Sequence, residues 1–224
     1  MDRTDIKVDG KSVIIIDDVF DKDTCTQWLR NYISDYEFRL ASREMEGNEE
    51  CKANFVHGLQ LFELEETFKL SSDIMPIIHE YNKHNNTDFK YTDMFRAHVN
   101  LFTKENKFTG HTDTEDNTGI VVLWFANPYF DDDGGGFTLG NDRFYVSNKF
   151  NRCVIFPSNM WHKTEEIVDE NSVRLTVYIG FSKQVGAHDN PFTHRMMPNA
   201  LSRSYSRCQS IAKQIHTDYG IGNG

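Results

Sequence analysis

The sequence predicts an α+β protein that is mainly β, with an antiparallel β barrel or sandwich at its centre and helices packed outside it. Between residues 94 and 182, short runs of β-branched and aromatic residues alternate with turn residues, a pattern typical of such a core. On both sides of this region, apolar residues recur at helical spacing. No repeat and no Pro/Gly/Ser-rich linker divides the 224 residues, so we expect one domain over residues 1–224.

Residues 12–90 are expected to support the core from the N-terminal side. Residues 12–16 form a β-branched run that predicts a buried strand. Asp21 or Asp23 can then cap a helix. The apolar face of that helix consists of residues spaced three and four apart, namely Cys25, Trp28, Leu29, Tyr32 and Ile33.

Two further helices are expected, one on each side of the β-rich region. The first covers about residues 72–84, with Pro76 near its first turn, where proline is tolerated. The second covers about residues 199–218, with Asn199 as its cap and Gly220 as its stop. Its apolar face contains Leu201, Tyr205, Cys208, Ile211, Ala212 and Ile215.

The β core itself is expected to cover about residues 94–182. Turn residues such as Asp131 to Gly136 and Asp169 to Asn171 separate its apolar runs. The strands are expected at residues 94–103, 119–126, 136–139, 143–147, 152–157 and 173–181.

Composition excludes several classes of protein. The 24 Lys and Arg residues against 34 Asp and Glu residues give a net charge of −10, which makes a nucleic-acid partner unfavourable. No apolar run is long enough to cross a membrane, and no apolar stretch follows the charged first residues as it would in a secretory signal. The four cysteines are far apart and form no Cys-x-x-Cys pair, which excludes a zinc ribbon. We therefore expect reduced thiols and a cytoplasmic location.

Three residues in the β-rich region have the types and spacing of a metal site. His111 and Asp113 are two positions apart, so on extended backbone they point to the same side. His162 precedes a later strand, which can bring it beside the first pair. Two imidazoles and one carboxylate on one face of a metal form the set used for non-haem Fe(II), with adjacent positions left open. His-x-Asp alone is weak evidence in a chain with nine histidines, so the prediction depends on the combination.

Arg174 follows His162 by a dozen residues, inside a predicted strand. It shares a face with Thr176, and this face alternates with apolar residues. An arginine that points into a barrel requires an anionic partner, because an unpaired buried charge is costly. A dicarboxylate matches the guanidinium fork, and the Thr176 hydroxyl can add a donor.

The order of these motifs resembles that of the Fe(II)/2-oxoglutarate-dependent dioxygenases, and within them the prolyl-4-hydroxylase-like group. The resemblance covers about residues 12–182. Besides the His-x-Asp, distal His and Arg-x-Thr motifs, it rests on Val-Ile-Ile-Ile-Asp-Asp-Val-Phe at 13–20, Gly-Gly-Gly-Phe-Thr-Leu at 134–139 and Val-Ile-Phe-Pro at 154–157. It implies a double-stranded β-helix, or jelly roll, as the core, flanked by N-terminal and C-terminal helices.

The resemblance also implies roles for individual residues. His111, Asp113 and His162 are expected to be the catalytic iron ligands. Arg174 is expected to bind the distal carboxylate of 2-oxoglutarate, helped by Thr176. Many members have a tyrosine that contacts this cosubstrate where Phe102 stands here, and Asn100, similar to an asparagine of the nucleic-acid demethylases, can take part of its role. Among the expected pocket walls are Phe102, Leu123 and Phe156.

The activity implied is hydroxylation of a C–H bond in a protein residue or a small amino-acid-like molecule. It uses O2 and 2-oxoglutarate, with ascorbate as a possible reductant, and releases succinate and CO2. One alternative is oxidation of a nucleobase. Asn100 and the excess of basic residues in 183–224 favour it, and the net charge of −10 disfavours it. The other is a non-catalytic, cupin-like binding module. The sequence leaves the oligomeric state open.

Overall fold

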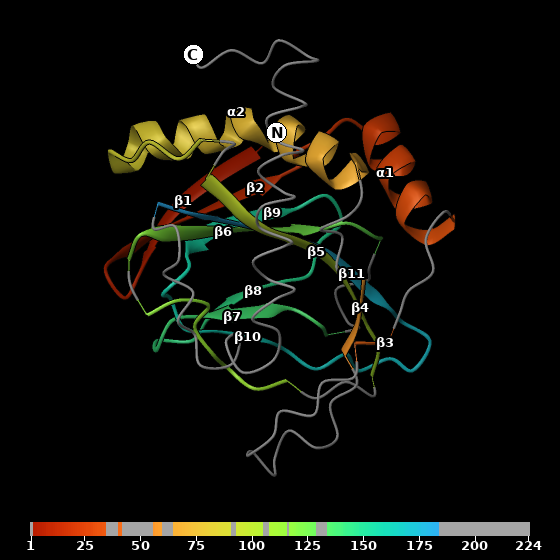
Figure 1. Ribbon diagram of the computed structural model, residues 1–224. Helices are drawn as coiled ribbons and strands as arrows, with labels where there is room; N and C mark the ends of the chain where they lie inside the picture. Colours follow the sequence, from red (N-terminus) through yellow and green to blue (C-terminus); the bar gives the residue numbers. More distant parts are fainter. Residues whose placement is uncertain are drawn as a thin grey trace.

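The computed structural model describes residues 2–34, 40–41, 56–59, 65–90, 93–104, 108–115, 117–128 and 134–183. Within these residues the protein is mostly β, with two antiparallel sheets stacked face to face (Figure 1). This confirms the prediction of a mainly β protein with antiparallel sheets. The helix expected over residues 199–218 lies outside the described residues.

The larger sheet has eight strands and the smaller has three. In the larger sheet the spatial order is β1 (Asp2–Val8), β2 (Lys11–Asp17), β9 (Cys153–Pro157), β6 (Gly119–Phe125), β11 (Arg174–Ser182), β5 (Met94–Phe102), β4 (Val56–Leu59) and β3 (Leu40–Ala41). In the smaller sheet it is β10 (His162–Thr164), β7 (Phe137–Leu139) and β8 (Phe144–Val146). Each of the six strands predicted between residues 94 and 182 therefore forms, with ends that differ by at most one residue.

Two helices cover the outer face of the larger sheet: α1 (Lys22–Ser34) and α2 (Glu65–Asn85) (Figure 1). Their buried side chains form one cluster with apolar residues of the sheet. Asp21 is the N-cap of α1, because its Oδ1 accepts a hydrogen bond of 2.9 Å from the backbone N–H of Thr24.

The start predicted for the second helix was wrong. The helix begins at Glu65 rather than near residue 72, so Pro76 lies in its interior and not in its first turn. Proline cannot donate the backbone hydrogen bond of its turn, which is why the sequence favoured a later start. Packing of this helix on the sheet, through residues such as Ile74, Ile77 and Ile78, offsets that loss.

The first strand, β1, was missed. Its residues are largely polar and solvent-exposed, and it lies at the edge of the larger sheet. It pairs with β2 through a two-residue turn at Asp9 and Gly10, whose φ angles of 49° and 74° are both positive. Such a turn is typical of a tight hairpin, and the Asp-Gly pair was the available signal.

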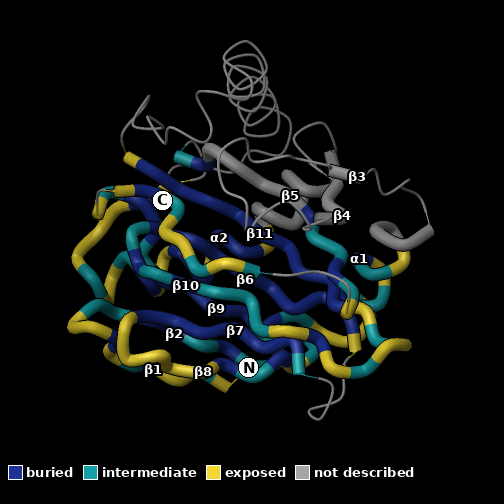
Figure 2. Tube along the Cα trace, turned by 90° about the horizontal axis from the view of Figure 1, so that it is seen from below, coloured by how far each residue is buried: buried dark blue, intermediate teal, exposed yellow. Residues whose placement is uncertain are grey.

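Strand β11 separates two apolar clusters. Leu175, Val177 and Ile179 point towards the helices and belong to the outer cluster. Arg174, Thr176 and Tyr178 alternate with them and therefore point into the space between the two sheets. Most of the apolar residues in that interior come from β6, β7 and β9. Figure 2 shows the traces of β7 and β9 as largely buried.

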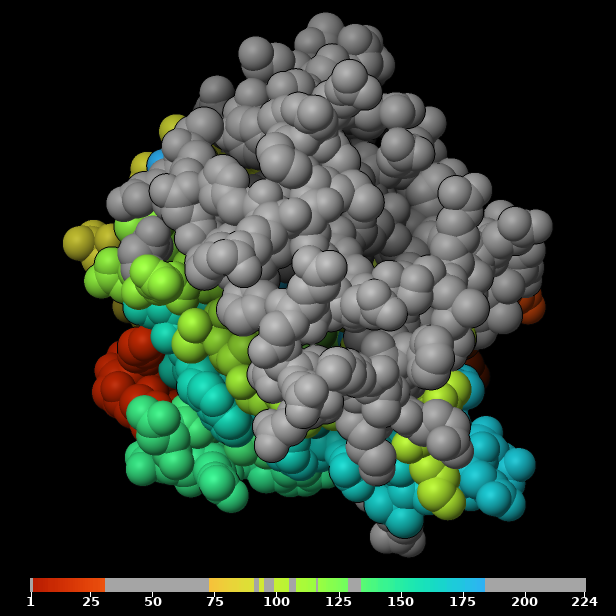
Figure 3. Space-filling model, turned by 60° about the horizontal axis from the view of Figure 1, so that its bottom comes forward, coloured from red at the N-terminus to blue at the C-terminus, as the bar shows by residue number. Residues whose placement is uncertain are grey.

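A surface cavity of about 260 Å³ lies between β1, β2 and β8. Residues of these strands lie side by side on the surface in Figure 3, where the N-terminal strand is red and the β7–β8 region is green. The residues that line this cavity include none of the predicted site residues. Among the described helices, none is both long and apolar enough to cross a membrane.

Candidate metal centre

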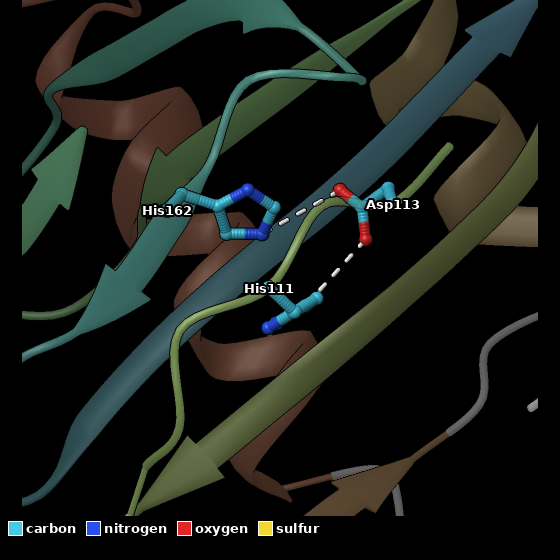
Figure 4. Close-up of side chains that lie close together, drawn as sticks. All are labelled: His111, Asp113 and His162. Atoms are coloured by element: carbon cyan, nitrogen blue, oxygen red, sulfur yellow. Dashed lines mark ion pairs between the residues drawn. The ribbon is translucent and has the colours of Figure 1, made fainter. Parts of the chain in front are cut away.

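The structure brings His111, Asp113 and His162 together, as the sequence predicted (Figure 4). His111 and Asp113 lie in the segment between β5 and β6, and His162 is the first residue of β10. The backbones of the two histidines form an isolated antiparallel bridge. In it, each N–H donates to the carbonyl oxygen of the other histidine, at 2.9 and 2.8 Å. This bridge joins two parts of the chain that are 51 positions apart in the sequence.

The Asp113 carboxylate lies between the two imidazoles. Its Oδ1 is 3.7 Å from His111 Nε2, and its Oδ2 is 3.6 Å from His162 Nε2. Two ligands on one metal, each bound at about 2.1 Å, are at most about 4.2 Å apart. Both measured distances are below that limit, and all three ligand atoms lie within 4.8 Å of one another. The donors are therefore grouped closely enough to hold a single metal ion after small shifts of the side chains.

The second nitrogen of each histidine faces a backbone carbonyl oxygen. His162 Nδ1 is 3.0 Å from Met160 O, and His111 Nδ1 is 3.3 Å from Thr109 O. Because a carbonyl oxygen only accepts hydrogen bonds, the proton of the neutral ring belongs on Nδ1 in both residues. The Nε2 lone pairs are then directed to the common space, as in metal-binding histidines whose other nitrogen donates to a carbonyl.

Burial keeps His162 in the form that binds metals. Burial lowers the pKa of its imidazole, and the nearby Asp113 carboxylate only partly opposes this effect. The neutral ring is thus favoured near pH 7. The side chain of His111 is 60% exposed while those of Asp113 and His162 are 8% and 7% exposed, so the centre opens to solvent on the side of His111.

Aromatic rings line the buried side of the centre. The rings of Phe137 and Phe156 lie 5.4 and 5.2 Å from the His162 ring, and 5.4 Å from each other. Phe156 and Leu123, two of the expected pocket walls, both belong to the apolar interior between the sheets. Phe137 was not predicted from the sequence, although it follows the Gly-Gly-Gly turn that carried part of the resemblance.

Arg174 is fully buried on the face of β11 that points into the interior between the two sheets. Its guanidinium carbon lies 5.2 Å from the centre of the Phe125 ring and 5.6 Å from that of Phe102, within the range of cation–π attraction. Its Nη1 donates a long hydrogen bond of 3.4 Å to Gly136 O. Gly136 precedes Phe137, whose ring touches His162, so the guanidinium and the metal-binding residues border the same interior space.

Thr176 and Asn100 lie opposite each other in the register of β11 and β5, and Arg174 lies opposite Phe102. Residues paired in this way point to the same face of a sheet, so all four lie on the interior side. Thr176 is fully buried, and its Oγ1 has no hydrogen-bond partner among the described residues. Tyr178, two positions further, lies on the same face and was missed, although its alternation with Thr176 was visible in the sequence.

Two of the tryptophans, Trp124 and Trp161, have different surroundings. Trp124 is fully buried on the helix side of the larger sheet, where its ring packs edge-on against Phe20 at 5.2 Å. Trp161 lies with its indole directly against the backbone of Gly110, next to His111. Trp124 is therefore a core residue, and Trp161 packs against the backbone next to the centre.

No protein-family model matches the sequence, and no curated protein sequence is closely similar to it. Solved structures do match. A prolyl hydroxylase from Trichoplax adhaerens, in complex with a peptide fragment of hypoxia inducible factor, is 19% identical with a TM-score of 0.59 and aligns over 76% of this chain and 83% of its own. A prolyl-4-hydroxylase from Pseudomonas putida is 15% identical with a TM-score of 0.57, over 76% and 92% of the two chains.

A third structure is HygX from Streptomyces hygroscopicus, with nickel, 2-oxoglutarate and hygromycin B bound. It is 11% identical with a TM-score of 0.55, over 77% of this chain and 83% of its own. Such low identities establish a common fold and nothing more. The fold of this chain is that of the prolyl hydroxylases and related 2-oxoglutarate-dependent enzymes, as the order of its sequence motifs implied.

Proposed function

We propose that the chain is an Fe(II)- and 2-oxoglutarate-dependent dioxygenase that hydroxylates a C–H bond. The observation that carries the proposal is the meeting of His111, Asp113 and His162 on the border of an interior that also contains the buried Arg174. The two stacked antiparallel sheets support the double-stranded β-helix as its core, in a single domain over residues 1–224. The products would be succinate, CO2 and a hydroxylated substrate.

The three clustered residues would hold the iron. Two neutral imidazoles and a carboxylate suit Fe(II), and three ligands on one face leave adjacent positions for a cosubstrate and O2. Bound there, the iron would supply the redox chemistry by which 2-oxoglutarate is oxidatively decarboxylated and a C–H bond is hydroxylated. The backbone bridge between His111 and His162 and the Nδ1 hydrogen bonds hold both rings in the orientation that this requires.

Arg174 would bind the distal carboxylate of 2-oxoglutarate through its guanidinium fork. The Phe102 and Phe125 rings hold the guanidinium plane and lower the local dielectric, which strengthens its attraction to an anion. The Thr176 hydroxyl would donate to the same carboxylate, and Asn100, its register partner on the neighbouring strand β5, would contribute a further polar contact. Phe102 has no hydroxyl for this task, so the polar contacts are assigned to Arg174, Thr176 and Asn100.

The exposed side of the centre gives a substrate access to it. His111 faces solvent, so a substrate can approach from that side without moving the apolar interior. Among the similar structures, one holds a peptide fragment and another holds hygromycin B, so both peptides and small molecules are accommodated by this fold. We therefore propose a protein residue or a small amino-acid-like molecule, in the cytoplasm, with ascorbate as reductant. The net charge of −10 disfavours nucleic acid.

Two experiments test the proposal. Anaerobic addition of Fe(II) and 2-oxoglutarate should produce a weak visible charge-transfer band, and its absence would indicate a binding module without this chemistry. A succinate-release screen over peptides, free amino acids and nucleic acids then looks for the substrate, with the His162→Ala enzyme as blank. Equal succinate release by the wild type and by His162→Ala would contradict the iron assignment.

A further inference from the structure

Ser158, in the turn before His162, forms hydrogen bonds to the segment that contains Asp113. The Ser158 carbonyl oxygen accepts hydrogen bonds from the backbone N–H groups of Asp113 at 2.9 Å and of Thr114 at 3.3 Å. The Ser158 N–H donates to Gly119 O at 3.0 Å. Thus the main chain of Ser158 binds both ends of the segment from Asp113 to Gly119.

The side chains of Ser158 and Thr114 add a second link. Their hydroxyl oxygens are 2.7 Å apart, in a hydrogen bond between residues 44 positions apart. Ser158 is 0% exposed and Thr114 is 6% exposed, so water does not compete for this bond. The absence of a side chain at Gly119 makes room for it, because a Cβ there would lie 2.5 Å from Ser158 Oγ.

The link matters for the centre because Thr114 is the neighbour of Asp113. The Asp113 carboxylate reaches both imidazoles, at 3.7 and 3.6 Å, so a small shift of its backbone changes both distances at once. Metal sites tolerate displacements of only about 0.5 Å before affinity falls. A buried hydrogen bond one residue away is therefore in a position to control the geometry of the ligand set.

We infer that the buried hydroxyl pair of Thr114 and Ser158 positions the Asp113 carboxylate and thereby sets the metal affinity of the centre. Both are positioning residues, since neither provides a ligand atom. The inference rests on the proposed function in one respect, that His111, Asp113 and His162 bind a metal ion. It adds two residues that the sequence motifs do not contain.

The test uses the full chain, with Co(II) as probe, because its visible bands report coordination geometry and its affinity for such sites is close to that of Fe(II). Three variants are compared: Thr114→Val, Ser158→Ala and the two combined. Each single variant removes the hydrogen bond between the two hydroxyls and keeps one of them buried, which lowers the stability of the metal-free protein. The double variant removes both hydroxyls and should recover most of that stability. Co(II) binding should be weakened about tenfold in all three, with altered visible bands.

Two controls separate positioning from stability. Thr114→Ser keeps the hydroxyl and should bind Co(II) as the wild type does. Ile78→Val shortens a core side chain in α2, on the helix side of the larger sheet, so it should lower the unfolding midpoint and leave Co(II) affinity unchanged.

The outcomes distinguish this inference from the proposed function. Wild-type Co(II) affinity and wild-type visible bands in the double variant would overturn the positioning role and leave the metal centre standing. A wild-type protein that does not bind Co(II) would overturn the metal centre, and the positioning role with it. Weakened binding in a double variant of near-wild-type stability supports the inference.

Discussion

Replacement of Arg174 with methionine should abolish most of the affinity for 2-oxoglutarate while the protein remains folded. Methionine fills a similar volume and packs well against the rings of Phe102 and Phe125, which flank the guanidinium. The variant loses the cation–π contacts, but it no longer has to bury a charge, and the two effects offset each other. The free energy of unfolding should therefore change by less than about 1 kcal/mol, which corresponds to about 2–4 °C in the midpoint of thermal unfolding.

The cost to cosubstrate binding is much larger. Loss of one partner of a buried, hydrogen-bonded charge pair costs about 2–5 kcal/mol, which is a weakening of about 30-fold to 5,000-fold. At a 2-oxoglutarate concentration of about 100 times the wild-type Kd, the ligand stabilises the wild type by about 2.7 kcal/mol. In Arg174→Met the same concentration is at most about three times Kd, which leaves less than about 0.9 kcal/mol.

The assay is thermal unfolding with saturating Mn(II), with and without 2-oxoglutarate. Arg152→Met is the matched control, because Arg152, just before β9, binds Asp17 and should leave the response to 2-oxoglutarate intact. Arg174→Lys keeps the charge and loses the fork, so its response should be intermediate. A full 2-oxoglutarate-dependent shift in Arg174→Met would refute the assignment of Arg174 to the cosubstrate.

Three further predictions concern the ligand Asp113, the packing of Gly110 beside the centre, and the ion pair of Asp17 in the larger sheet. Asp113→Ala should abolish succinate release and Co(II) binding; normal turnover would contradict the ligand assignment. Gly110→Ala should lower the free energy of unfolding by about 1–3 kcal/mol and weaken Co(II) binding, because a Cβ there overlaps the Trp161 indole; adding Trp161→Leu should restore both. Hydrogen bonds from Arg152, with help from Lys149, lower the pKa of Asp17 to about 2 from its usual 3.8. Because the pKa of Asp17 is lower in the folded state, its ionised form stabilises the fold above about pH 4, and this stabilisation is lost as the pH falls towards 2. In urea unfolding, Asp17→Asn should therefore lower the free energy of unfolding by about 2 kcal/mol at pH 7 and by about half that at pH 3.

The strands of the core were predictable because their signal is local. Runs such as those of β6 and β9 are apolar and are bounded by turn residues, and the same runs remain buried in the structure. Two of the failures, at β1 and at α2, have opposite causes. The strand β1 consists of polar residues at an edge, so no apolar pattern marks it. The helix α2 contains Pro76, a local signal against a helix that tertiary packing overrides.

The metal centre was predictable as a set of residue types and not as a geometry. His-x-Asp on extended backbone places two donors on one side, and that inference needs only the sequence. The bridge to His162 and the hydroxyl bond from Thr114 to Ser158 join positions 51 and 44 apart. Nothing local specifies such contacts, because they depend on how β9 and β10 lie against the preceding segment.

Strand β11 shows how one element can serve stability and chemistry separately. Its outward residues, Leu175 to Ile179 at every second position, pack under the helices, while Arg174 and Thr176 point into the interior between the sheets. Because the side chains alternate, a substitution on one face leaves the contacts of the other face in place. Val177→Ala should therefore lower the free energy of unfolding by about 2 kcal/mol or more, since it opens a cavity under the helices, yet leave the Kd for 2-oxoglutarate nearly unchanged. A Val177→Ala protein that remains folded but binds 2-oxoglutarate as poorly as Arg174→Met would show that the two faces are coupled, and that the interior geometry depends on the helices outside the sheet.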